Sequence, residues 1–136
     1  MKANELMLGD YVTFKECQKD TVPTIIKIWQ INGDNDALVS IDNDDALDEI
    51  AIDEEIVGIQ ITPKILEKNG FSQDLLNGHI FIFHEKYGEV IYYEYGPKYG
   101  LTIDNQLATI QDLKINYVHE LQHALRLCGI EKEIVL

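Results

Sequence analysis

The sequence predicts an α+β fold: a small SH3-like β-barrel, followed by a helix, an antiparallel sheet and a C-terminal amphipathic helix. In the first half of the chain, short β-branched and aromatic runs alternate with Asp, Asn, Gly and Pro, which is typical of short strands joined by turns. Thr62-Pro63 then gives a clear helix-start signal, and apolar residues near the C-terminus recur at helical spacing. We therefore predict two domains, residues 1–61 and residues 62–136.

Five strand-like runs precede the predicted boundary: Tyr11–Phe14, Thr24–Ile31, Ala37–Ile41, Glu49–Ile52 and Ile56–Ile61. Two of these runs alternate apolar residues with others, as expected of strands that have one buried face. A sheet of short strands can protect its edges by closing on itself, and this consideration favours the barrel. The stretch Leu8-Gly9-Asp10-Tyr11-Val12 resembles the beginning of such barrels in translation-associated modules, whose RNA binding the acidity of this chain argues against.

The second half begins with a predicted helix. Thr62 is suited to the N-cap, Pro63 to the first helical turn, and Asn69-Gly70 to the C-terminal stop. Turn sequences then separate four strand-like runs: His79–His84, Val90–Tyr95, Gly100–Ile103 and Leu107–Ile110. An antiparallel meander is the simplest arrangement of these runs. A last helix is expected from about Lys114 to Cys128, with Gly129 as its stop.

Composition limits the class of protein. A chain of 136 residues, of which 46% are hydrophobic, can bury one core or two small ones. The N-terminus lacks the basic end and apolar run of a signal peptide, and no stretch approaches the ~20 apolar residues of a membrane-spanning helix. These observations predict a cytoplasmic protein. Cys17 and Cys128 lack the paired spacing of a zinc knuckle or redox motif, so free thiols are expected.

The chain is strongly acidic, with a formal net charge of −13 at pH 7. This charge repels nucleic-acid phosphates and anionic lipids. Ten carboxylates lie between Asn32 and Ile56 with no Lys or Arg among them. Read as a calcium loop from Asp42, the segment has Leu47 where Gly is needed and Asp53 where the usual Glu stands. We interpret it as solvated turns between strands, or as a surface for a basic partner.

One motif suggests catalysis. His119-Glu120-Leu121-Gln122-His123 matches the H-E-x-x-H signature of zinc peptidases. On a helix, the two imidazoles face the same side and can share one zinc ion, while Glu120 polarises the bound water. The metal would be held by His119 and His123, and Glu120 would be the catalytic residue.

Such a site needs a third protein ligand, and candidates are scarce. Glu131 and Glu133 follow too closely after the helix to return easily across its metal face. His79 and His84 would be an unusual upstream source, and their spacing places them on opposite faces of a strand.

The helical pattern around the motif favours a structural interpretation. At about 100° per residue, one apolar arc is expected to face the core; it comprises Val118, Leu121, Ala124, Leu125 and Cys128. The opposite side, with His119, Gln122 and His123, is expected to face solvent, and Arg126 would disfavour a nearby dication. We therefore expect no catalytic site, no bound metal and no cofactor, with zinc as the alternative.

Three blocks of the chain carry a resemblance: "MKANELMLGDYV", "ITPKILEKNGF" and "YVHELQHALRLCGI". With them the chain resembles a family of small uncharacterised proteins from gut Bacteroidetes and their mobile elements or phages. The resemblance covers nearly the whole chain and implies no assigned reaction. It also implies that Gln can stand at the position of Glu120, and Gln would not serve as a catalytic base.

Tyrosines offer a second candidate surface. Six of the seven lie between Tyr87 and Tyr117, and they suit recognition because their side chains are large, rigid and amphipathic. Tyr92, Tyr95 and Tyr99 are the candidates for an interaction surface. The alternative is that they are ordinary sheet residues, since tyrosine also favours strands.

These observations predict a non-catalytic protein-interaction module, associated with a mobile element or phage, whose partner is a protein rather than nucleic acid or a membrane. The partner would bind the acidic loops or the tyrosine-rich sheet. One alternative is a zinc-dependent hydrolase that uses the HELQH motif. A second is an acidic decoy that occupies the basic groove of a nucleic-acid-binding host protein.

Overall fold

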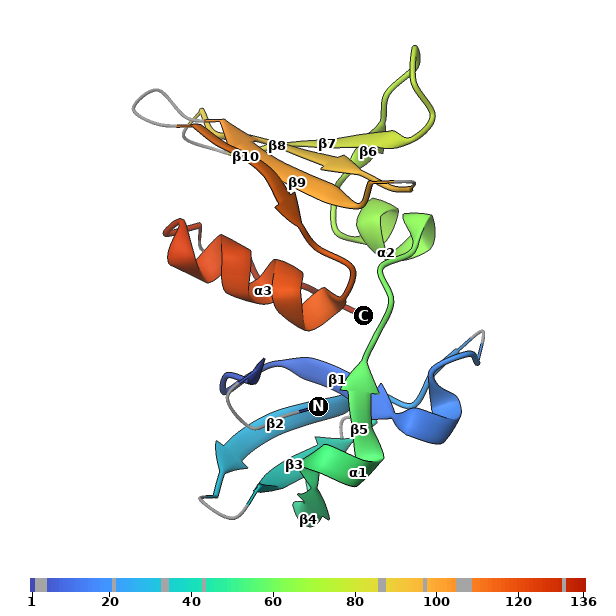
Figure 1. The fold of residues 1–136 in the computed structure, drawn as a ribbon, viewed down its shortest axis with the longest axis vertical. Helices are drawn as coiled ribbons and strands as arrows, with labels where there is room; N and C mark the ends of the chain where they lie inside the picture. Colours follow the sequence, from blue (N-terminus) through green and yellow to red (C-terminus); the bar gives the residue numbers. More distant parts are fainter. Residues whose placement is uncertain are drawn as a thin grey trace. The chain divides into compact units, whose positions relative to one another are not determined.

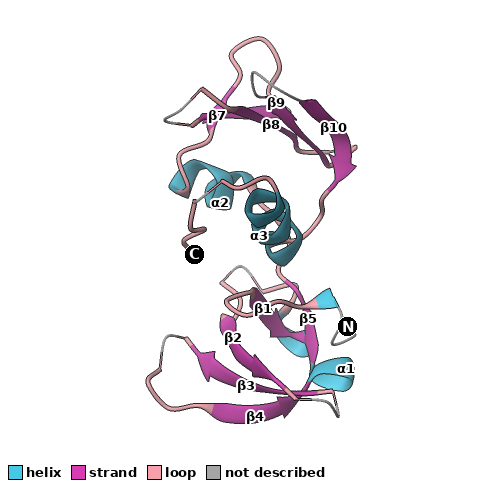
Figure 2. Cartoon of the chain, turned by 90° about the vertical axis from the view of Figure 1, so that its left-hand side faces the viewer, coloured by secondary structure: helices cyan, strands magenta, loops and turns pink. Residues whose placement is uncertain are grey.

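The computed structural model describes residues 1, 5–20, 22–32, 35–42, 44–85, 88–96, 98–104, 109–130 and 132–136. These residues form two antiparallel sheets and a few helices, whose order along the chain can be followed in Figure 1. Figure 2 shows the strands and helices by type. The mixed α+β class predicted from the sequence is therefore confirmed.

The first sheet has the strand order β4-β3-β2-β1-β5. Its strands are β1 (Tyr11–Phe14), β2 (Ile26–Ile31), β3 (Asp36–Ile41), β4 (Asp48–Ala51) and β5 (Ile56–Gly58). All neighbours in the sheet are antiparallel. A 3-10 helix, η2 (Lys15–Cys17), follows β1, and the one-turn helix α1 (Ile52–Glu55) precedes β5; the sequence predicted neither.

Alternation along these strands builds the first core. Val12 on β1 pairs with Ile26 on β2 and with Gly58 on β5, so the central strands direct their apolar side chains to one face. The buried cluster comprises Leu6, Val12, Ile26, Ile28, Ala37, Val39, Ile52 and Ile56.

Closure into a barrel was expected, and the described strands do not show it. β4 and β5 stand at the two ends of the strand order, and no pairing joins them among the described residues. The β4 edge exposes Asp48 and Glu49, and charged side chains on an edge strand discourage further pairing.

The second sheet is the predicted antiparallel meander, with the order β10-β9-β8-β7-β6. Its strands are β6 (Ser72–Gln73), β7 (Ile80–His84), β8 (Val90–Glu94), β9 (Gly100–Asp104) and β10 (Thr109–Lys114). Strand β6 was not predicted, and Leu107 and Ala108 of the last predicted run lie outside the described residues. The buried face carries Phe81, Ile91, Tyr93, Leu101 and Ile103.

Helix α2 (Pro63–Lys68) begins and ends where the local signals predict. Thr62 Oγ1 accepts a hydrogen bond from the Ile65 amide at 3.3 Å, Asn69 is the C-cap, and Gly70 has φ +88°. Asn69 also holds the C-terminal residues, because its amide donates to the Val135 carbonyl at 2.8 Å and accepts from the Val135 N–H at 2.7 Å.

Helix α3 (Val118–Leu127) begins four residues later than predicted. Lys114 instead extends β10, where it pairs with Gly100, and Tyr117 makes an isolated bridge with Gln60 before the helix starts. Gly129 follows the helix with φ +71°, in agreement with its predicted role as the stop.

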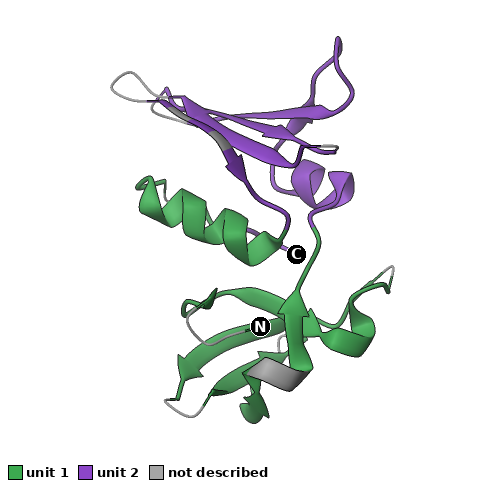
Figure 3. Cartoon of the chain, in the orientation of Figure 1, with its two compact units in different colours: residues 1–60, 117–133 green, residues 61–116, 134–136 purple. Residues whose placement is uncertain are grey.

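The chain divides into two compact units, shown in green and purple in Figure 3. Unit 1 comprises residues 1–60 and 117–133, and unit 2 comprises residues 61–116 and 134–136. The predicted boundary lies next to this division. The predicted second domain included the last helix, however, and α3 belongs to unit 1, because its polar side chains bond to the segment that begins β1.

Candidate functional site

The HELQH motif lies on the first turns of α3, and its glutamate caps the helix. Glu120 Oε1 accepts a hydrogen bond from the Tyr117 backbone N–H at 3.0 Å. A carboxylate at this position also interacts favourably with the positive end of the helix dipole. The residue that the motif would use as catalytic base therefore has a structural role in starting the helix.

Gln122 joins α3 to the strand that begins the first sheet. Its Nε2 donates to the Gly9 carbonyl at 3.2 Å, and its Oε1 accepts from the Tyr11 N–H at 3.0 Å. Gly9 has φ +87°, a conformation that glycine adopts without strain. The buried Gln122 amide thus pairs with the Gly9 carbonyl and the Tyr11 N–H, the backbone groups on either side of Asp10.

Asp10 is the centre of a polar cluster beneath the helix. Its side chain has no exposed surface, and it accepts from the Met7 N–H at 2.7 Å. The same oxygen lies 2.6 Å from His123 Nε2, and the other oxygen lies 3.2 Å from Arg126 Nη1. One ring nitrogen of His123, the second histidine of the motif, is therefore hydrogen-bonded to a buried carboxylate.

His119 is enclosed between aromatic rings. Its ring stacks on that of Tyr117, with centroids 5.8 Å apart and planes 12° from parallel, and it meets the His123 ring edge-on at 5.7 Å. Only 5% of the residue is exposed, and Nδ1 has no hydrogen-bond partner among the residues that the structure describes. Burial lowers the pKa of His119, while the negative charges of Asp10, Glu120 and Glu5 oppose the shift.

The expectation that this face of α3 is solvent-exposed is wrong for His119 and Gln122, which are both buried. The helical pattern separates apolar from polar side chains correctly, but polar side chains can be buried when their partners lie in another segment. The apolar arc is buried as predicted at Val118, Leu121, Ala124 and Leu125, whereas Cys128 is half-buried.

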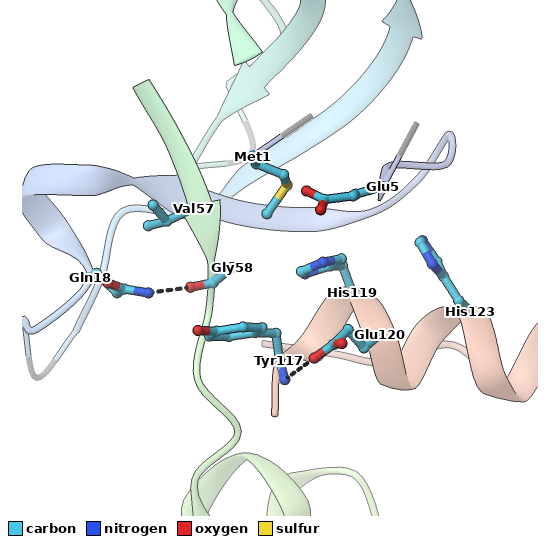
Figure 4. Close-up of a pocket in the computed structure, with 9 residues that line it drawn as sticks. All are labelled: Met1, Glu5, Gln18, Val57, Gly58, Tyr117, His119, Glu120 and His123. Atoms are coloured by element: carbon cyan, nitrogen blue, oxygen red, sulfur yellow. Dashed lines mark hydrogen bonds between the residues drawn. The ribbon is translucent and has the colours of Figure 1, made fainter. Parts of the chain in front are cut away.

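A pocket of about 570 Å³ lies beside the motif within unit 1. Figure 4 shows the side chains that line it: Met1, Glu5, Gln18, Val57, Gly58, Tyr117, His119, Glu120 and His123. Gln18 Nε2 donates to the Gly58 carbonyl at 3.3 Å across one wall. Gly58 leaves room for the rings, since a Cβ there would lie 2.5 Å from Tyr117 Cγ and 2.9 Å from His119 Cε1.

The proposed metal ligands do not form a complete set in the part of the chain that the structure describes. No group of three or more His, Cys, Asp or Glu side chains there is arranged to hold a metal ion. Glu131 lies outside the described residues, and His79 and His84 lie on or beside β7 in unit 2. The chemistry that the arrangement does support is hydrogen bonding between α3 and the start of β1.

The three tyrosine candidates have different surroundings. Tyr92 lies on β8 with 37% of its surface exposed. Tyr95 and Tyr99 follow β8 and pack edge-on against each other, with ring centroids 5.6 Å apart. Tyr95 is also held through its backbone, because its N–H donates to the His79 carbonyl at 2.7 Å. Tyr92 is therefore the candidate whose side chain is most available to a partner.

Carboxylates of the acidic segment have local structural roles. Asp42 Oδ1 accepts from the Ile25 N–H at 2.9 Å, and Asp44 Oδ1 accepts from the Ala46 N–H at 3.3 Å. The bond of Asp44, to a residue two positions on, is typical of Asp in turns, whereas the bond of Asp42 joins the residue after β3 to the residue before β2. Both agree with the interpretation of this segment as turns between strands.

Sequence reasoning missed Asp10 and Gly58 as members of the cluster around the motif. The signal at Asp10 was an acidic residue directly before a strand of apolar and aromatic residues, although nothing local shows that an imidazole more than a hundred residues away will bond to it. Gly58 carried no local signal, because its role is to leave space for rings from α3.

Comparison of the chain with protein-family models, with curated proteins and with solved structures finds no match. Among the described residues, no helix has the length and apolar character needed to cross a membrane.

Proposed function

We propose that this chain is a non-catalytic protein-interaction module, and that its partner binds the outer face of the second sheet. The observation that carries the proposal is a row of paired residues, Ile82, Tyr92 and Thr102, across β7, β8 and β9. Directly paired residues point to the same face. The neighbouring row of Phe81, Tyr93 and Leu101 is buried, so the first row lies on the opposite face.

This outer face has the composition of a recognition surface. Tyr92 is exposed at its centre, and Ile80, Ile82 and Val90 remain half-exposed around it. Tyrosine beside aliphatic side chains is enriched in the centres of protein interfaces, because a rigid aromatic ring loses little conformational entropy on binding.

The non-catalytic part of the proposal is supported by the use of the motif within the fold. Glu120 caps α3, Gln122 bonds to Gly9 and Tyr11, and His123 bonds to Asp10. These bonds give the side chains of the motif a role in the fold that needs neither a metal ion nor a reacting water molecule.

Site-specific photo-crosslinking tests the interaction surface. p-Benzoylphenylalanine would replace Tyr92 in one variant and Trp29, an exposed aromatic residue of the first sheet, in a matched control. We expect one protein partner to crosslink from position 92 in a lysate of the encoding organism, and not from position 29. Equal crosslinking from both positions, or none from position 92, would contradict the proposal that the partner binds this face.

We further propose an SH3-like arrangement for unit 1 and a cytoplasmic location for the chain. The SH3-like arrangement is supported by the strand order, in which β1 lies between β2 and β5 and a short helix precedes β5. Nuclear Overhauser contacts between Thr13 and Val57 test it, and their absence would contradict it. The cytoplasmic location is supported by the two free cysteines, because thiols stay reduced in the cytosol. Cell fractionation tests this location.

The acidic decoy is a second candidate function. Asp44, Asp45, Asp48 and Glu49 are all exposed on the turn before β4 and on its edge. Such a surface complements a basic groove. We expect salt-sensitive capture of a basic nucleic-acid-binding protein that weakens when Asp48 and Glu49 are replaced by Asn and Gln; a bait that recovers none at low salt counts against this function.

A further inference from the structure

We propose that the turn between β6 and β7 is a docking element that inserts Leu75 and Leu76 into an apolar groove of a protein partner, with basic residues beside that groove. The inference rests on the proposed interaction function and names the part of unit 2 that enters the partner. Figure 1 shows this turn extending away from the sheet that carries it.

The two leucines are unusual in their exposure. Leu75 and Leu76 have relative exposures of 101% and 98%, the highest among the large hydrophobic residues that the structure describes as exposed. Single exposed apolar residues are normal on protein surfaces. Two adjacent leucines with no buried surface at the end of a projecting turn contribute nothing to the core, and burial against a partner would remove both from water.

The turn that presents them is held by hydrogen bonds. Asp74 N–H donates to the Ile80 carbonyl at 2.8 Å, and Asp74 Oδ1 accepts from the Leu76 N–H at 3.2 Å. Ile80 N–H donates in turn to the Asn77 carbonyl at 3.1 Å.

Side-chain bonds close the same turn further. Asn77 Oδ1 accepts from the His79 N–H at 3.0 Å, and Gln73 Nε2 donates to the Gly78 carbonyl at 2.8 Å. The polar side chains of the turn therefore fix its backbone while both leucines point into solvent. A preorganised apolar element loses less entropy on binding than a disordered one.

The charge of the chain distinguishes between the possible binding partners of this turn. From Ser72 to Ile80 the chain carries a carboxylate at Asp74 and no Lys or Arg, and the whole chain has a net charge of −13. An anionic bilayer would repel this surface, and two copies of the chain would repel each other. An apolar groove flanked by Lys or Arg on another protein complements the leucines, the Asp74 carboxylate beside them and the net negative charge of the chain.

The turn also lies next to the proposed outer face. Ser72 on β6 pairs with Ile82, and Ile82 pairs with Tyr92. One partner can therefore contact Tyr92 and receive the leucines from the adjoining turn.

The test places p-benzoylphenylalanine at position 76 of the full chain, irradiates cells of the encoding organism, and maps the crosslinked peptide by mass spectrometry. We expect a partner peptide from an apolar groove with Lys or Arg beside it, and at least a tenfold loss of the crosslink on L75S. The matched control L47S, on an exposed leucine of the acidic segment, should leave the crosslink unchanged. Thermal unfolding of L75S should equal that of the wild type, because Leu75 is not buried.

Three results would overturn the inference: crosslinks only between copies of the chain, co-sedimentation of the wild type with phosphatidylglycerol vesicles that L75S abolishes, or no crosslink from position 76. Crosslinks from position 92 without any from position 76 would overturn this inference and leave the proposed function standing. Crosslinks from neither position would overturn both.

Discussion

Asp10 is the buried carboxylate that His123 and Arg126 of α3 share. It is fully buried, yet its two oxygens reach the Met7 backbone, His123 and Arg126. A buried carboxylate is tolerated only when donors surround it, and here the donors come from the preceding turn and from the far end of the chain. The exposed part of Arg126 is screened by water, which reduces the contribution of that ion pair.

Replacing Asp10 by Ala should lower the free energy of unfolding by about 2–3 kcal/mol, because Arg126, His123 and the Met7 amide lose a common acceptor. Urea denaturation measures this change. The control is Asp48→Ala on the exposed β4 edge, for which we expect a change within about 0.5 kcal/mol. Equal stabilities of the two variants would contradict the role given to Asp10.

His119 should make stability depend on pH. Burial lowers its pKa below the usual 6.5, so the unfolded chain takes up a proton at a higher pH than the folded chain does. The free energy of unfolding should therefore fall as the pH drops below 6.5, by at most about 1.4 kcal/mol per pH unit from this group, and be unaffected by it above.

The variant His119→Asn removes this titration, so its free energy of unfolding should fall less steeply between about pH 6.5 and pH 5. Urea denaturation across this range provides the comparison. Parallel curves for the wild type and the variant would show that His119 does not couple to folding.

Helices α2 and α3 differ in how well their ends could be predicted from neighbouring residues in the sequence. Helix α2 could be predicted almost to the residue, because its cap, its first-turn proline and its stop are all local features at Thr62, Pro63 and Asn69-Gly70. The start of α3 could not, because pairing of Lys114 with Gly100 in β10 competes with the helical pattern and is a long-range contact.

The burial of the polar face of α3 was unpredictable for the same reason. The sequence shows that His119 and Gln122 share the side opposite to Leu121 and Leu125, and an amphipathic helix on a surface would expose them. Their partners are the backbone at Gly9 and Tyr11 and the ring of Tyr117, so the environment of these residues depends on contacts that periodicity does not encode.

The contact between α3 and β5 can be tested at Gly58. A methyl group there would lie 2.5 Å from Tyr117 Cγ and 2.8 Å from Cδ1, so Gly58→Ala should destabilise unit 1 by about 1–3 kcal/mol. The control Gly78→Ala meets only the flexible end of Gln73 at 3.1 Å and should change the free energy of unfolding by less than about 0.5 kcal/mol. Equal effects would argue against close packing at Gly58.

In the whole molecule, the two compact units do not correspond to two continuous stretches of the chain. Unit 1 is assembled from residues 1–60 and 117–133, so the polar cluster between Asp10 and α3 joins two distant segments. The predicted boundary could be located from Thr62-Pro63, because a turn and a helix start are local. The return of the last helix to the first sheet could not be located, because it rests on hydrogen bonds to Gly9, Asp10 and Tyr11.

A fragment of residues 1–61, the first domain as predicted from the sequence, should therefore not fold cooperatively by itself. It lacks α3, and the carboxylate of Asp10 and the Tyr11 N–H lose the side chains that satisfy them. Dispersion of amide signals in a proton–nitrogen spectrum is the readout. A well-dispersed spectrum with a cooperative thermal transition would contradict the assignment of α3 to unit 1.

Hydrogen bonds from Gln122 and His123 join α3 to the first sheet, and from this role we predict that the HELQH motif holds no catalytic metal. Metal analysis of the full chain, purified without a histidine tag in the presence of excess zinc and then desalted, tests this claim most directly, with His119→Ala and His123→Ala as matched variants. We expect well below one zinc ion per chain in all three proteins. One zinc ion per wild-type chain, lost in both variants, would contradict it and support the zinc-dependent hydrolase.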